Sequence, residues 1–142
     1  MAQFSWTDDL YTGSTLIDED HRKLVELVNA FFQSMQSGQG NGGVRKAMKQ
    51  LIAYTEEHFA REEAEMQRIQ YVAALAHQAE HIKLLKQLVE LKAMLDAGGR
   101  INIPAVSDFL GAWLRDHILA ADMKLAAALK QQRSAEPAPQ LH

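Results

Sequence analysis

The sequence contains no cysteine, which excludes disulfide scaffolds, thiol catalysis, cysteine-ligated zinc and iron–sulfur clusters. It also lacks any run of about 18 apolar residues, the length that a membrane-spanning helix needs. The N-terminus has neither a basic start nor an apolar stretch, so no signal peptide is expected. With 15 basic and 18 acidic residues the net charge is −3, which provides no basic surface for nucleic acid. We therefore expect a cytoplasmic protein that binds no nucleic acid and does not insert into membranes.

Proline and glycine, which interrupt regular structure, are few and gathered at a small number of places. Glycines cluster over residues 38–43, and Gly98 and Gly99 precede Pro104. Between these breaks, apolar residues recur at steps of three and four, which is the spacing of a helix with one buried face. This pattern predicts helices over about residues 18–37, 44–69, 73–95 and 104–131, with Asp18 as the N-cap of the first.

Four long helices joined by short connections pack as antiparallel neighbours. The sequence therefore predicts an all-α fold, an antiparallel up-down four-helix bundle with an irregular N-terminal arm. The arm carries Phe4, Trp6 and Tyr11, which we expect to pack across the bundle because their rings are otherwise exposed. A chain of 142 residues that is 47% hydrophobic can build one core. We expect one domain over residues 1–132 and a disordered, proline-containing tail over residues 133–142.

The most informative pattern is the position of the histidines. Five of the six fall in phase with the apolar stripes of the predicted helices: His21, His58, His77, His81 and His117. Glu62 lies four residues after His58 and faces the same way. A single inward histidine is commonly a hydrogen-bonded core residue, but five imidazoles and a carboxylate in one core are costly unless something binds them. This set favours a metal site for iron, zinc, copper or manganese. We place the neighbouring Glu63 and Glu65 on a solvated face.

In the fourth predicted helix the spacing of the inward-facing residues shifts by one residue after His117. Regular steps after His117 would turn Lys124 toward the core, whereas skipping one residue brings Asp122, Leu125 and Leu129 inward. A single-turn π-bulge supplies one extra residue of this kind, and such bulges recur at functional sites. Asp122 is therefore predicted to be a further metal ligand, the alternative being an exposed acid in a regular helix.

These residues resemble the ligand set of the hemerythrin family, and specifically of the single-domain bacterial hemerythrins. The resemblance covers about residues 4–130 and is carried by Ile17-Asp18-x-x-His21, His58-Phe59-x-x-Glu62, His77-x-x-x-His81, and Trp113-Leu114-x-x-His117-Ile118 with Asp122. All seven ligand positions of the family motif are filled, and the family fold is the bundle inferred above.

The resemblance further implies a non-haem di-iron centre that binds dioxygen reversibly. It implies that one iron is held by His77, His81 and His117 and the other by His21 and His58. Glu62 and Asp122 would bridge the two irons together with an oxo or hydroxo group. The resemblance also implies an apolar oxygen pocket, formed here by Leu24, Phe59, Trp113, Leu114 and Ile118.

Counting coordination positions adds a separate argument. Five imidazoles, two bridging carboxylates and one bridging oxygen leave a single open position on two octahedral metals, and it falls on the metal held by His21 and His58. Ferritin-like oxidases use more carboxylates and fewer histidines. The set found here therefore favours reversible dioxygen binding without enzymatic activity, as an oxygen carrier, store or delivery protein. The sequence does not indicate which protein would receive the oxygen. We expect a monomer or a weak oligomer.

Two alternatives stay open at this point. The run from His77 to His81, with Glu80 between them, matches the H-x-x-E-H signature of a family of zinc proteases, but a zinc hydrolase would leave the other inward histidines without a purpose. A di-iron domain of this kind can also act as a sensor of oxygen, redox state or nitric oxide, or as an iron store.

Overall fold

The computed structural model describes residues 4–36, 40–98, 102–116 and 121–135. These residues form five α-helices and one short 3₁₀ helix, and they contain no strand. The helices are α1 (Thr15–Gln36), α2 (Gly40–Arg68), α3 (Ala74–Asp96), α4 (Ile103–Asp116) and α5 (Met123–Ala135), with η1 (Asp8–Leu10) in the arm. The predicted all-α fold is confirmed.

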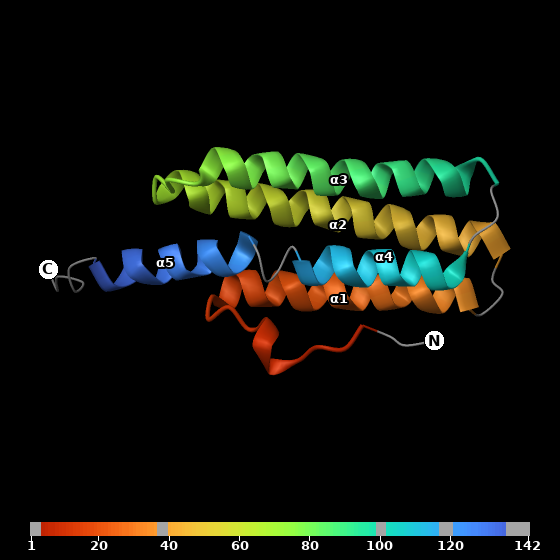
Figure 1. The fold of residues 1–142 in the computed structure, drawn as a ribbon, viewed down its shortest axis with the longest axis horizontal. Coiled ribbons are helices and arrows are strands. Elements are labelled where there is room, and N and C mark those ends of the chain that lie inside the picture. Colours follow the sequence, from red (N-terminus) through yellow and green to blue (C-terminus); the bar gives the residue numbers. More distant parts are fainter. Residues whose placement is uncertain (1–3, 37–39, 99–101, 117–120, 136–142) are drawn as a thin grey trace, which may run out of the picture.

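The helices lie side by side as a bundle, with α5 continuing the line of α4 (Figure 1). Helix α1 packs against α2 and α4, and α2 packs against α3. The up-down bundle is therefore as predicted, except that its fourth member is described as two helices. None of the described helices combines the length and the apolar character that crossing a membrane requires.

Two helices begin earlier than predicted by more than one residue. Helix α1 begins at Thr15, because Ser14 Oγ accepts a hydrogen bond from Ile17 N–H at 3.4 Å and so acts as the N-cap. Asp18 is not the cap; its carboxylate accepts 2.8 Å hydrogen bonds from the backbone N–H and hydroxyl of Thr12. Helix α2 extends into the predicted glycine break, where the burial of Val44 anchors its first turns.

At the other end of the chain, α5 continues to Ala135, past the predicted domain boundary at residue 132. From residue 136 onward the predicted tail lies outside the described residues.

The turn between α2 and α3 returns the chain tightly toward the bundle. Tyr71 N–H donates to Met66 O at 2.9 Å and Gln70 N–H donates to Gln67 O at 3.2 Å, which together form a Schellman motif. Gln70 occupies the left-handed position of this motif, with a φ of 52°, where glycine is the usual residue. The motif places the first turn of α3 beside the last turns of α2.

The N-terminal arm packs on the bundle as expected. Phe4 and Leu10 are buried, and the backbone of Phe4 exchanges two hydrogen bonds with the side-chain amide of Asn29, at 2.8 and 2.9 Å. The guanidinium of Arg22 lies over the rings of both Trp6 and Tyr11. Tyr11 itself is 43% exposed, so the prediction that its ring is covered by the bundle does not hold.

The core consists of two separate apolar clusters. The larger one fills most of the bundle and includes Leu24, Phe31, Leu84 and Leu114. The smaller one lies where α1 begins, α2 ends and α5 runs, and consists of Ile17, Met66, Leu125, Ala126 and Leu129. A layer of buried polar side chains separates the two clusters along the helices.

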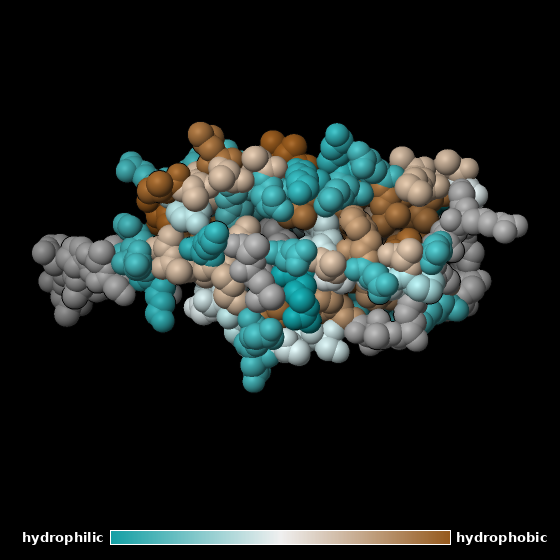
Figure 2. All heavy atoms as spheres, viewed as in Figure 1, coloured by the Kyte–Doolittle hydropathy of each residue, from teal (hydrophilic) through white to brown (hydrophobic). Residues whose placement is uncertain are grey.

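Helix α3 is apolar on its outer side as well. Leu75, Ile82 and Val89 recur every seven residues and are exposed, and Val72 precedes them in the turn. Hydrophobic atoms accordingly appear along the upper edge of the molecule, where α3 runs (Figure 2). The amphipathic pattern of α3 is weaker than that of α1 for this reason.

Candidate metal centre

The polar layer between the two clusters is formed by the predicted metal ligands. Helix α1 contributes His21, α2 contributes His58 and Glu62, α3 contributes His77 and His81, and Asp122 comes from the turn before α5. All six side chains are buried, none more than 5% exposed. The helical phase that predicted their direction is therefore confirmed for these residues. The seventh predicted ligand, His117, lies outside the described residues.

The donor atoms of these residues form two groups that could each hold a metal ion. One group comprises His21, His58, Glu62 and Asp122, and the other Glu62, His77, His81 and Asp122. Within each group the donor atoms lie within 4.8 Å of one another. Both carboxylates belong to both groups, so the geometry is that of two adjacent sites with two shared acids.

Asp122 turns its two oxygens toward different histidines. Its Oδ2 lies 2.5 Å from His21 Nε2 and 3.4 Å from His58 Nε2, whereas its Oδ1 lies 3.0 Å from His77 Nε2. The backbone at Ala121 and Asp122 is π-helical. This is the local widening that the shift in spacing predicted, and it brings Asp122 to the bundle axis.

Glu62 occupies the opposite side of the same space. Its Oε1 lies 2.9 Å from His81 Nε2 and 3.5 Å from both His58 Nε2 and His77 Nε2. Neutral imidazole nitrogens and carboxylate oxygens are donors that suit iron and exclude the all-oxygen cages typical of calcium or magnesium. The chemistry of this donor set therefore fits a pair of transition-metal ions.

Without a metal, the carboxylates hold protons on two of the imidazoles. Burial lowers the pKa of His58, but hydrogen bonds to Asp122 and Asp20 outweigh burial and raise it to about 10. Burial likewise opposes protonation of His77, yet Asp122 and Glu62 raise its pKa to about 9. A metal ion would have to displace these protons.

Two acids that contact the predicted ligands were missed by the reasoning from sequence. Asp20 accepts a hydrogen bond from His58 Nδ1 at 2.9 Å, and Glu63 accepts one from His81 Nδ1 at 3.2 Å. The placement of Glu63 on a solvated face is therefore wrong in part, because Glu63 is only one-third exposed and touches an inward histidine. Both acids fall in phase with buried neighbours, Asp20 three residues after Ile17 and Glu63 four residues after Phe59, and this signal could have identified them.

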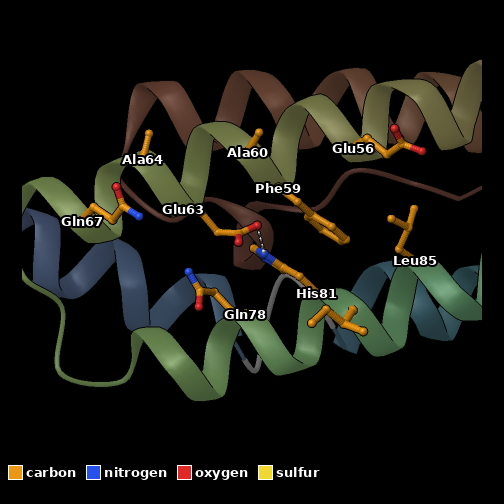
Figure 3. A pocket seen from close by; sticks show the side chains of 10 residues that line it. Glu56, Phe59, Ala60, Glu63, Ala64, Gln67, Gln78, His81 and Leu85 are labelled. Atoms are coloured by element: carbon orange, nitrogen blue, oxygen red, sulfur yellow. Dashed lines mark hydrogen bonds and ion pairs between the residues drawn. The ribbon is translucent and has the colours of Figure 1, made fainter.

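Glu63 and His81 line a groove of about 460 Å³ between α2 and α3. Figure 3 shows the ion pair between them at the floor of this groove, with Phe59 beside the imidazole. The Phe59 ring stacks on His81 with centroids 3.8 Å apart and covers that face of the imidazole. His81 is thus held by a stacked ring and two carboxylates.

The residues expected to form an oxygen pocket lie in the larger apolar cluster. Leu24, Phe59, Trp113 and Leu114 are each buried in it, while Ile118 lies outside the described residues. Trp113 directs its one polar atom away from the site, since its Nε1–H donates to Leu84 O at 3.2 Å. The cluster therefore presents an apolar wall next to the donor layer.

The zinc-hydrolase alternative is not supported by the described geometry. Glu80, the acid of the H-x-x-E-H run, belongs to neither group of donor atoms and lines a second, outer pocket with Tyr71 and Lys124. The histidines of that run share their carboxylates with His21 and His58 instead.

The family model "Hemerythrin HHE cation binding domain" matches residues 12–129. The chain belongs to the hemerythrin family. A bacteriohemerythrin of Pseudomonas paraeruginosa is 30% identical over 134 residues, which cover 94% of this chain and 86% of that protein. A bacteriohemerythrin of Stenotrophomonas maltophilia is 32% identical over 130 residues, covering 92% and 84%. A crystal structure of wild-type hemerythrin superimposes with a TM-score of 0.81 at 29% identity, covering 90% of this chain and 98% of that one.

Proposed function

We propose that this hemerythrin holds two iron ions and binds dioxygen reversibly, as an oxygen carrier or store and not as an enzyme. The observation that carries the proposal is the sharing of Glu62 and Asp122 between two groups of donor atoms. A single metal would use one such group, whereas two adjacent ions use both and are bridged by the shared carboxylates.

The proposal assigns the ligands as follows. His21 and His58 hold one iron, His77, His81 and His117 hold the other, and Glu62 and Asp122 bridge the pair. A pair of iron(II) ions held by these residues would supply the two electrons that reversible dioxygen binding requires. The chain's own contribution is to hold the described donors on segments that pack together in one helical bundle.

The apolar wall has a distinct task. Leu24, Trp113 and Leu114 are buried beside the donor layer and offer it no hydroxyl, amide or charge. These side chains would keep water and protons away from dioxygen held at the centre. Reversibility therefore depends on the wall, and iron retention depends on the donors.

The test is to load the metal-free protein with iron(II) under anaerobic conditions, remove the excess, and count iron per chain. We expect two iron ions per chain and a visible absorption band that appears in air and disappears when the gas is removed. One iron per chain at saturation, or no iron uptake at all, would contradict the proposal. An absorption band that forms in air and never reverses would instead identify a redox sensor or an iron store.

A further inference from the structure

Asp20 is a buried acid that belongs to neither group of metal donors. It lies on α1 next to His21 and is 5% exposed. Its Oδ2 accepts hydrogen bonds from His58 Nδ1 at 2.9 Å and Arg61 Nε at 2.9 Å. Its Oδ1 accepts from Arg61 Nη2 at 2.8 Å and from the hydroxyl of Tyr54 at 2.8 Å. Both oxygens are thus engaged by α2 and held in one position.

We propose that Asp20 is a positioning residue that fixes His58 with its Nε2 toward the metal, and that Arg61 limits how strongly Asp20 increases the electron donation of that imidazole. The inference rests on the proposed function. When Nδ1 donates to a carboxylate, the ring keeps one tautomer and one orientation, and its other nitrogen becomes a more basic ligand. Asp20 thereby acts through His58 and touches no metal itself.

The negative charge of Asp20 and the positive charge of Arg61 then change the electron donation of His58 in opposite directions. A bare carboxylate draws the Nδ1 proton toward itself, enriches the imidazole in electron density and favours iron(III). The guanidinium, bound through two parallel hydrogen bonds, offsets this by withdrawing negative charge from the carboxylate. Tyr54 contributes a smaller effect in the same direction as Arg61, since its hydroxyl is a neutral donor.

The other carboxylate–imidazole pair differs in its surroundings. Glu63, which holds His81, is one-third exposed at the floor of the groove in Figure 3. The groove exposes this carboxylate to solvent, which screens its charge. The two halves of the centre are therefore tuned by different means, one by a fixed ion pair and the other by solvent.

The experiment compares Asp20→Asn, Arg61→Gln and Tyr54→Phe with Glu57→Gln as the matched control. Glu57 lies on the same helix and 3.8 Å from Arg61 Nη1, is exposed, and does not contact Asp20. The midpoint potential of the iron-loaded protein is measured by redox titration. We expect it to rise in Asp20→Asn, to fall in Arg61→Gln, to fall slightly in Tyr54→Phe, and to stay unchanged in the control. Shifts of the same sign in Asp20→Asn and Arg61→Gln, which a purely structural role would give, overturn the proposal.

A second measurement does not depend on iron. The zinc affinity of each variant is determined by competition with a chelator, and Asp20→Asn should bind zinc about 10–100-fold more weakly than the wild type. Asp20→Glu should restore most of the loss, because it keeps the carboxylate. Unchanged zinc affinity in Asp20→Asn overturns the positioning role even if the wild type binds two irons. A wild type that takes up zinc but no iron refutes the proposed function, and the zinc comparison then still decides the role of Asp20.

Discussion

Metal uptake by this protein should release protons, and the number released follows from the acids around the histidines. Asp122, Asp20 and Glu62 raise the pKa of His58 to about 10 and Asp122 and Glu62 raise that of His77 to about 9, against the work of burial. Both imidazoles are then almost fully protonated at neutral pH, and both must lose the proton before they can coordinate a metal. Binding at pH 7 should therefore release protons from both of these residues, and binding at pH 9 should release fewer, because His77 is then partly deprotonated already.

The release is measured by calorimetry in two buffers of different ionisation enthalpy, with zinc as the metal. Magnesium is the control, because it prefers oxygen ligands and should displace no imidazole protons. Protons from metal-bound water do not decline with rising pH in this way, so the decrease between pH 7 and pH 9 identifies the histidines. A release that stays constant or grows over this interval would refute the reasoning.

The same shifts have a consequence for the metal-free fold. The pKa values of His58 and His77 in the folded protein lie above the ordinary value of 6.5. The stabilisation that these protonated imidazoles give the metal-free fold is therefore complete below pH 6.5 and is lost as the pH rises through about 9 and 10. Metal affinity changes in the opposite direction and increases over that range, so the metal-bound protein should stay folded where the metal-free protein weakens.

Three further predictions concern single side chains. Glu63→Gln should weaken metal binding by about 10-fold, since it removes the charge that holds a ligand imidazole, whereas Glu65→Gln should not; metal retention against a chelator distinguishes them. Leu114→Asn should accelerate the decay of the oxygenated spectrum at full iron loading. The control is Leu95→Asn, in the same cluster at the far end of α3, which should lower stability alone. Equal decay rates of the two variants at matched folded fraction would argue against the apolar wall. Gln70→Gly should raise the free energy of unfolding by about 1 kcal/mol, because glycine adopts the left-handed conformation without strain. Urea denaturation measures the change, and an unchanged or lower midpoint would show that Gln70 is not under strain in the Schellman motif.

Much of the candidate centre could be predicted from the sequence because its candidate ligands obey the same periodicity as the core. His58 and Glu62 share a helical face, as do His77 and His81, and a step of four is visible in the sequence. Asp122 could be found because a regular helix there would bury a lysine. In each case a local rule of spacing was sufficient.

The supporting acids were harder to find because their roles depend on contacts between helices. Asp20 acquires its role from His58 and Arg61 on α2, and Glu63 acquires its role from His81 on α3. A charged residue beside a buried stripe is common, so spacing alone did not separate these acids from solvated ones. The start of α1 was misplaced for a related reason, since Ser14 and Asp18 are both good caps and only the turn at Thr12 decides between them.

The division of the core into a large and a small cluster constrains how such a chain can change in evolution. On α1, Ile17 belongs to the small cluster, His21 is a candidate ligand and Leu24 belongs to the large cluster. On α2 the order along the chain is the reverse: Phe59 belongs to the large cluster, Glu62 is a candidate ligand and Met66 belongs to the small cluster. Inserting one residue into either stretch would turn the donor by about 100° and remove it from the site. The helix ends that the α1–α2 and α3–α4 connections join lie at the opposite end of the bundle (Figure 1). Insertions and deletions among relatives should therefore collect at those two connections, while the turn from α2 to α3 keeps its length.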